Sequence, residues 1–159
     1  MSSESTVIQF WVNDEKVEAP AADGDMSLLN YLRDSLGLNR ARYGCGAAAC
    51  GACTVVCNGE AVTSCDQVLS ELHGVRVETP ESLGSEAQPH AVLATLVKHQ
   101  AVQCGYCISG IAMRVKALLE KNPTPSKQSL DKALDHHLCR CGTHVRIKRA
   151  VYELAGIGA

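Results

Sequence analysis

The apolar residues in the first half of the chain follow the two-residue period of β-strands. Two turns break this pattern: Asn13-Asp14, and Asn58-Gly59, a dipeptide type that strongly favours a two-residue hairpin because both positions tolerate positive φ. Pro80 ends the last apolar run, since proline cannot donate a ladder hydrogen bond. The predicted strands are residues 6–12, 16–19, 54–57, 60–64 and 75–79.

Helical spacing appears once in this first half and dominates the second. Leucines recur at three- and four-residue intervals over 28–36, with Ser27 or Asp25 as N-cap candidates and Gly37 as the stop. After Pro80 the strand pattern disappears, so the chain is expected to change from mostly β to all-α near residues 80–85. The predicted helices of the second half are residues 85–100, 107–121, 126–137 and 143–155.

Composition narrows the possible functions. Aromatic residues make up only 4% of the chain, which leaves little material for the base-stacking surfaces of single-stranded nucleic-acid binders. No apolar run approaches the ~20 residues of a membrane span, and residues 1–6 lack the features of a secretory signal. We therefore expect a cytoplasmic protein that binds no nucleic acid. Residues 98–159 carry an excess of basic side chains. This excess would suit an acidic or phosphate-bearing partner, or it is simply the solvated surface of ordinary helices.

Nine cysteines in a reducing compartment point to metal or redox chemistry rather than disulfides. The first four follow the spacing C-x4-C-x2-C-x11-C, the pattern of plant-type [2Fe–2S] proteins. Gly44, Gly46 and Gly51 allow the loop to wrap a cluster and to bring backbone N–H groups near its sulfurs. A structural zinc site is the alternative, but it usually draws its ligands from two short knuckles. The predicted ligands are Cys45, Cys50, Cys53 and Cys65.

A second set of cysteines is spaced C-x2-C-x31-C-x-C and lies wholly in the helical half. Spacing alone leaves zinc and iron equally open here. The ninth cysteine, Cys57, is interpreted as core filler in a strand, and the six histidines are scattered, although His136 and His137 precede this set closely. No phosphate loop, dinucleotide fingerprint or Ser-His-Asp arrangement is visible. The second predicted ligand set is Cys104, Cys107, Cys139 and Cys141.

Five short motifs combine these cysteines with particular neighbours. They are Tyr43-Gly44-Cys45-Gly46, Cys50-Gly51-Ala52-Cys53-Thr54-Val55, Ser64-Cys65, Gln103-Cys104-Gly105-Tyr106-Cys107 and Leu138-Cys139-Arg140-Cys141-Gly142-Thr143.

With these motifs in this order, nearly the whole chain resembles the iron–sulfur small subunit of the molybdenum hydroxylases, the xanthine oxidase family. Residues 106–109 and 143–145 look most like those of the N-heterocycle dehydrogenases. The resemblance implies an α+β fold, with a β-grasp, plant-type ferredoxin-like domain over 1–80 and a helical [2Fe–2S]-binding four-helix bundle over 84–159. Two positions depart from the family pattern: Ala48 stands where another glycine is common, and Cys57 where a cysteine is unusual.

The resemblance also implies cofactors and partners. Both cysteine sets would hold [2Fe–2S] clusters, and Gln103 and Cys141 would contact the pterin of a molybdopterin cytosine dinucleotide on a large subunit. Electrons would leave to FAD in a further subunit or to a cytochrome. The expected overall reaction is hydroxylation of an N-heteroaromatic with oxygen from water, with an aldehyde-oxidising enzyme as the alternative.

Two other functions are compatible with the cysteine pattern, and simple measurements would distinguish them. A free-standing two-cluster ferredoxin would purify alone with both clusters, and a zinc-bound interaction module would lack visible absorbance and labile sulfide. The basic residues Arg140, Arg146, Lys148 and Arg149 are expected to lie at the interface with the molybdenum subunit.

Overall fold

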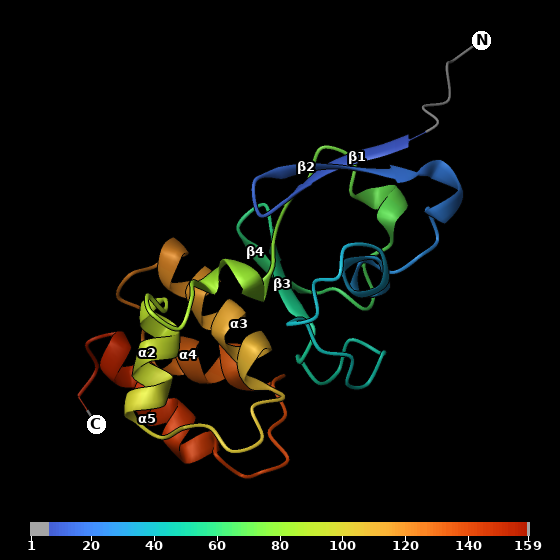
Figure 1. Ribbon diagram of the computed structural model, residues 1–159. Helices are drawn as coiled ribbons and strands as arrows, with labels where there is room; N and C mark the ends of the chain where they lie inside the picture. Colours follow the sequence, from blue (N-terminus) through green and yellow to red (C-terminus); the bar gives the residue numbers. More distant parts are fainter. Residues whose placement is uncertain (1–6, 159) are drawn as a thin grey trace.

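A five-stranded mixed sheet forms the first half of the protein in the computed structural model, which describes residues 7–158. The order across the sheet is β2-β1-β5-β3-β4; β1 and β5 run parallel and the other neighbours antiparallel. The sheet lies at one end of the molecule and the long helices at the other (Figure 1). The strands are β1 Val7–Val12, β2 Glu15–Pro20, β3 Thr54–Cys57, β4 Glu60–Thr63 and β5 Arg76–Glu78.

Both predicted hairpins are present. Asn13 and Asp14 take φ values of 50° and 69°, and Asn58 and Gly59 take 48° and 82°. Positive φ at both central residues matches the right-handed twist of the flanking strands, which is why these side chains suit the turns. Thr6, which was predicted to begin the first strand, lies outside the described residues.

The predicted first helix is short and irregular. Ser27 caps α1 (Leu28–Asn30) by accepting a hydrogen bond from the Asn30 N–H, and a π-helical turn, η2 (Tyr31–Ser35), follows. Fully buried leucines on these turns pack against the inward face of β1, where Ile8, Phe10 and Val12 alternate with partly exposed residues. This packing forms the core of the first half. Short 3₁₀ turns complete it at η1 (Ala21–Asp23), η3 (Leu69–Glu71) and η4 (Pro80–Leu83).

Four α-helices make up the second half of the described chain, as predicted. Helix α2 packs mainly on α5, and α3 packs on α4. The first of them begins later than expected, because Gly84 at φ 88° bridges to Pro89 and His90 then caps the helix by accepting from the Val92 N–H. The helices are α2 Ala91–Lys98, α3 Ile108–Lys121, α4 Lys127–Leu134 and α5 His144–Leu154.

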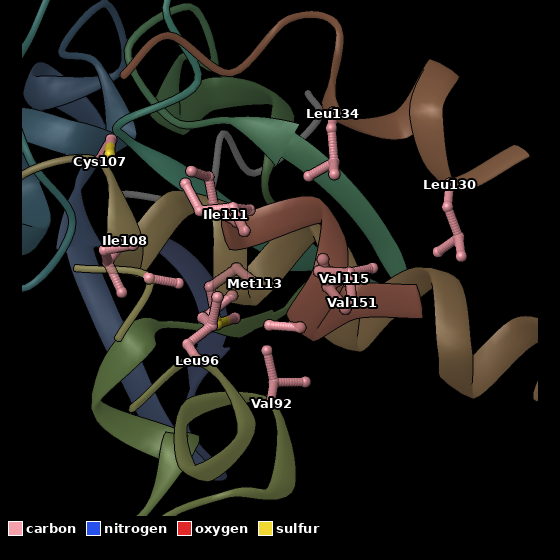
Figure 2. Packing of buried hydrophobic residues seen from close by; sticks show 14 of the residues in the cluster. Val92, Leu96, Cys107, Ile108, Ile111, Met113, Val115, Leu130, Leu134 and Val151 are labelled. Atoms are coloured by element: carbon pink, nitrogen blue, oxygen red, sulfur yellow. The ribbon is translucent and has the colours of Figure 1, made fainter. Parts of the chain in front are cut away.

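Helix α3 is the element that joins the two halves. Its buried residues Ile111, Met113 and Val115 lie at the centre of the helical core (Figure 2). That core also includes Val56 of β3, so the sheet contributes directly to it. The buried Lys116 makes ion pairs with Glu78 of β5 at 2.6 Å and Glu120 at 2.8 Å. No helix within residues 7–158 is long and apolar enough to cross a membrane.

Candidate functional site

The first four cysteines gather on one surface loop and the turn after β4. Cys45 is exposed, Cys50 and Cys65 are half-buried, and Cys53 is buried. The thiols lie in two neighbouring pairs: Cys50 makes a small contribution to the lowered pKa of Cys45, and Cys65 contributes, after burial, to the raised pKa of Cys53. Ser64 brings Cys65 into place, because its N–H and its hydroxyl both donate to the Cys53 carbonyl, at 3.2 and 2.7 Å.

Backbone N–H groups of three consecutive alanines point at these sulfurs. Ala47 and Ala49 donate to Cys45 Sγ, and Ala48 donates to Cys65 Sγ, each at 3.3 Å. The Ala47 and Ala49 N–H groups, with a smaller contribution from Cys50, outweigh burial and lower the pKa of Cys45 to about 7. This loop therefore stabilises thiolate, the form that binds metal. The sequence predicted such donors at the glycines, whereas the alanines supply these three.

The glycines instead provide space. A Cβ on Gly44 would lie 2.6 Å from Cys50 Sγ, and one on Gly46, at φ 66°, would overlap the Tyr43 hydroxyl. At Gly51, φ is 74° and a Cβ would lie 2.6 Å from Cδ2 of His137. At each of these positions the absence of a Cβ lets a neighbouring side chain pack against the backbone.

Ala48 sits at φ 54°, a left-handed conformation that favours glycine. This explains why a glycine suits the position. We expect Ala48→Gly to leave both clusters in place and to be neutral or stabilising by up to about 1 kcal/mol, since relief of strain is partly offset by the greater backbone entropy of glycine in the unfolded chain. Thermal loss of visible absorbance measures this; a clearly lower midpoint would contradict it. Ala47→Gly is the matched control, because Ala47 is not at positive φ.

The second four cysteines come together from the start of α3 and the loop between α4 and α5. Cys104 neighbours Cys141, and Cys107 neighbours Cys139, because the second thiol of each pair affects the pKa of the first. Burial raises the pKa of Cys107 to about 12. Burial also raises the pKa of Cys139, but hydrogen bonds from Thr143, whose Oγ1 lies 3.1 Å from Sγ, outweigh it and bring the value to about 7.

The paired thiols fit a binuclear cluster. Each iron of a [2Fe–2S] cluster binds two cysteine thiolates, and each set presents two pairs. Within residues 7–158, no three His, Cys, Asp or Glu side chains are close enough together to hold a single metal ion. The soft donor set, the N–H groups directed at sulfur and the space at Gly44 all suit an iron–sulfur cluster.

The two cysteine sets face one another. A cavity of about 320 Å³ is lined by Cys50 of the first set and by Cys104, Cys107 and Cys139 of the second. The Leu138 N–H donates to the Cys50 carbonyl at 3.0 Å, so one hydrogen bond connects Cys50 to the residue beside Cys139.

The remaining candidates lie around the two sets. Gln103 is exposed next to Cys104. Cys57 is on β3, and burial raises its pKa to about 11, which fits the interpretation as core filler. His137 is buried and hydrogen-bonds to Thr54 Oγ1 at 3.2 Å, in line with a structural role. Thr143 was not singled out for its contact with Cys139, and its place directly after Cys141-Gly142 was the available signal.

Two family profiles match the chain, and they overlap over residues 79–94. The profile of the 2Fe-2S iron-sulfur cluster binding domain matches residues 10–94, and that of the [2Fe-2S] binding domain matches residues 79–152. One of the subunits of nicotinate dehydrogenase from Pseudomonas putida is 47% identical over 150 residues, which cover 94% of this chain and 95% of the relative. The chain is an iron–sulfur subunit of the molybdenum hydroxylase family.

Other relatives support this membership. The alpha subunit of isoquinoline 1-oxidoreductase from Brevundimonas diminuta is 41% identical to this chain. The match covers 94% of this chain and 97% of that subunit. Among solved structures, quinoline 2-oxidoreductase from Pseudomonas putida 86 contains a chain that superimposes with a TM-score of 0.85 and 27% identity, over 96% of both chains. An iron–sulfur subunit of this size therefore has full-length counterparts in the family, and the chain is a subunit of an oxidoreductase rather than its catalytic part.

Proposed function

We propose that this subunit carries electrons through two [2Fe–2S] clusters, from a molybdenum site on a large partner subunit to an acceptor on another. The observation that supports it most is the arrangement of eight cysteines as four thiol pairs around adjacent sites. Cys45, Cys50, Cys53 and Cys65 would hold the first cluster, and Cys104, Cys107, Cys139 and Cys141 the second. When bound, the clusters supply one-electron redox chemistry.

The chain's own residues would set the route of the electrons. The hydrogen bond from Leu138 N–H to the Cys50 carbonyl offers a short connection through the backbone between Cys139 and Cys50. Exposed Cys45 and the loop around it give the first site access to an acceptor at the surface. Gln103 lies beside Cys104, which pairs with Cys141, so both proposed pterin contacts occur at the second site. We therefore place electron entry at the second site and exit at the first.

We further propose the identity of the partners. The pterin would be molybdopterin cytosine dinucleotide on the large subunit, and the acceptor FAD or a cytochrome haem on another. Similarity to nicotinate dehydrogenase and isoquinoline 1-oxidoreductase supports cytoplasmic hydroxylation of an N-heteroaromatic with oxygen from water over aldehyde oxidation.

We also propose that residues 1–80 form a β-grasp domain and 84–159 a separate four-helix bundle.

An exposed apolar surface near the second site supports docking of the large subunit there. Tyr106 and Leu138 are 47% and 64% exposed although they line the cavity between the two cysteine sets. Lys148 is already paired with Asp131 at 2.9 Å, so less of its charge is available to a partner than the sequence alone suggests. Arg140, Arg146 and Arg149 remain exposed for that role.

The test is gentle purification of the tagged chain from its native host. Co-purification of a large polypeptide, molybdenum, and iron with labile sulfide for two clusters per copy of this chain would support the proposal. The chain alone with both clusters and no molybdenum would favour a free-standing ferredoxin. Zinc in place of iron would refute both.

Gln103→Ala tests the pterin contact. Because Gln103 is exposed, the variant should fold and keep both clusters. Residues that orient a redox centre from outside its ligand shell typically change activity by about 10-fold or more. We expect such a fall in the rate at which substrate reduces the clusters, measured by stopped-flow absorbance. Gln128→Ala, at an exposed position of α4, is the control; an equal effect of both variants would contradict the role of Gln103.

A further inference from the structure

Arg114 on α3 is a half-buried cation without an anionic partner in the described part of the chain. Its Nε is fully buried and has no hydrogen-bond acceptor, and its guanidinium makes no ion pair within residues 7–158. Lys116, two residues along the same helix, instead pairs with two glutamates. Burial lowers the pKa of Arg114. A buried N–H without an acceptor is costly, and a half-buried cation lacks part of its hydration, so this arrangement requires an explanation.

Arg114 lies against the loop of the first cysteine set. It is one helical turn beyond Gly110, and residues four apart share a helix face. Gly110 packs directly on the Gly51 carbonyl, so closely that a Cβ there would overlap it. Arg114 also lines a cavity of about 350 Å³ together with Ala48 and Gly51.

Other groups around this cavity do not neutralise the arginine. Asp66 is exposed, accepts a hydrogen bond from Thr63 at 2.6 Å, and is not within ion-pair distance of Arg114. Gln67 is uncharged, and His136 and His137 bring no negative charge. Glu60 lines a neighbouring cavity with Arg114 but pairs with Lys121 instead. The other anionic group next to this loop would be the cluster itself, since four thiolates give it a net negative charge.

We propose that the first cluster is the counter-charge of Arg114 and that Arg114 raises the reduction potential of that cluster. This rests on the proposed function. Reduction adds one electron and makes the cluster more negative, and a nearby positive charge in a partly desolvated site stabilises that form. The electron comes from the second cluster, which is oxidised in the same step, and no proton is needed. Arg114 thereby favours electron flow from the second site towards the exposed first site.

The experiment is a potentiometric titration of the assembled complex, followed by the electron paramagnetic resonance signals of both clusters. Arg114→Met removes the charge and keeps an apolar stem, whereas Arg114→Lys keeps the charge. We expect Arg114→Met to shift the midpoint of the first cluster to lower potential, by more than that of the second, and Arg114→Lys to shift it much less. Lys16→Met is the control, because it removes one positive charge from β2 at the far edge of the sheet.

Three results would overturn the inference. One is an unchanged midpoint of the first cluster in Arg114→Met with both signals present. Another is an equal shift in Lys16→Met. The third is loss of a cluster from both Arg114→Met and Arg114→Gln, which would assign Arg114 a structural role. Failure of the proposed function is separate, since it would show as missing iron and sulfide in the unmodified protein.

Discussion

Replacing Cys139 with alanine should remove the second cluster and abolish electron transfer, while the first cluster remains. Cys139 is the thiol of its set whose pKa is brought to about 7, and it pairs with Cys107, whose pKa is about 12. Its loss leaves one iron with a single thiolate, and thiolates are the ligands that hold such clusters. Iron and sulfide per chain should fall by about half, and substrate turnover should be lost.

Cys57→Ala is the matched control for this experiment. Cys57 lies on β3 away from both sets and is half-buried, so its removal should keep both clusters and cost about 1 kcal/mol of stability or less. Full iron content in Cys139→Ala would refute the ligand assignment. Loss of iron in Cys57→Ala would show that the ninth cysteine has a role in cluster binding.

Gly110→Ala is expected to destabilise the contact between the two halves. The new Cβ would overlap the Gly51 carbonyl and approach the Ala52 carbonyl carbon, both of them backbone atoms that cannot rotate away. Overpacking of this kind costs about 1–3 kcal/mol, or roughly 2–10 °C in the unfolding midpoint of a chain of this length. Because Gly51 lies between Cys50 and Cys53, the first cluster should also be lost earlier on heating. Calorimetry and absorbance together measure both effects.

The neighbouring substitution Ser109→Ala separates this effect from a general change in helix α3. The Ser109 hydroxyl is buried and has no hydrogen-bond partner within the described residues, so alanine should be neutral or slightly stabilising there. A fall in stability for Ser109→Ala similar to that for Gly110→Ala would contradict the explanation. An unchanged midpoint for Gly110→Ala would show that the Gly51 loop can move aside.

Local signals predicted most elements well. The turns Asn13-Asp14 and Asn58-Gly59 form because their side chains tolerate positive φ, a property of the residues themselves. Helical periodicity predicted α3 to within one residue at its start, Ile108. Predictions were less accurate where tertiary packing determines the bounds or the type of a helix. The helix expected from Ser85 begins at Ala91, and the leucine-rich helix after Ser27 continues as a π-helical turn.

The sequence also predicts both cysteine sets, since spacing along a loop limits which thiols can meet. It did not predict which cysteines pair within a set. It also missed the N–H donors of Ala47, Ala48 and Ala49, because any residue supplies a backbone N–H and only the loop conformation directs it at sulfur.

By itself, the sequence determined the β-then-α order and the hairpin turns, and it predicted the division of eight cysteines into two ligand sets, because these depend on residue type and short-range spacing. The tertiary structure alone decided that the two sets share a cavity, that Leu138 hydrogen-bonds to Cys50, and that Arg114 is left without an acidic partner beside Gly51. These contacts join residues more than 50 positions apart, and only the packing of α3 against the sheet brings them together.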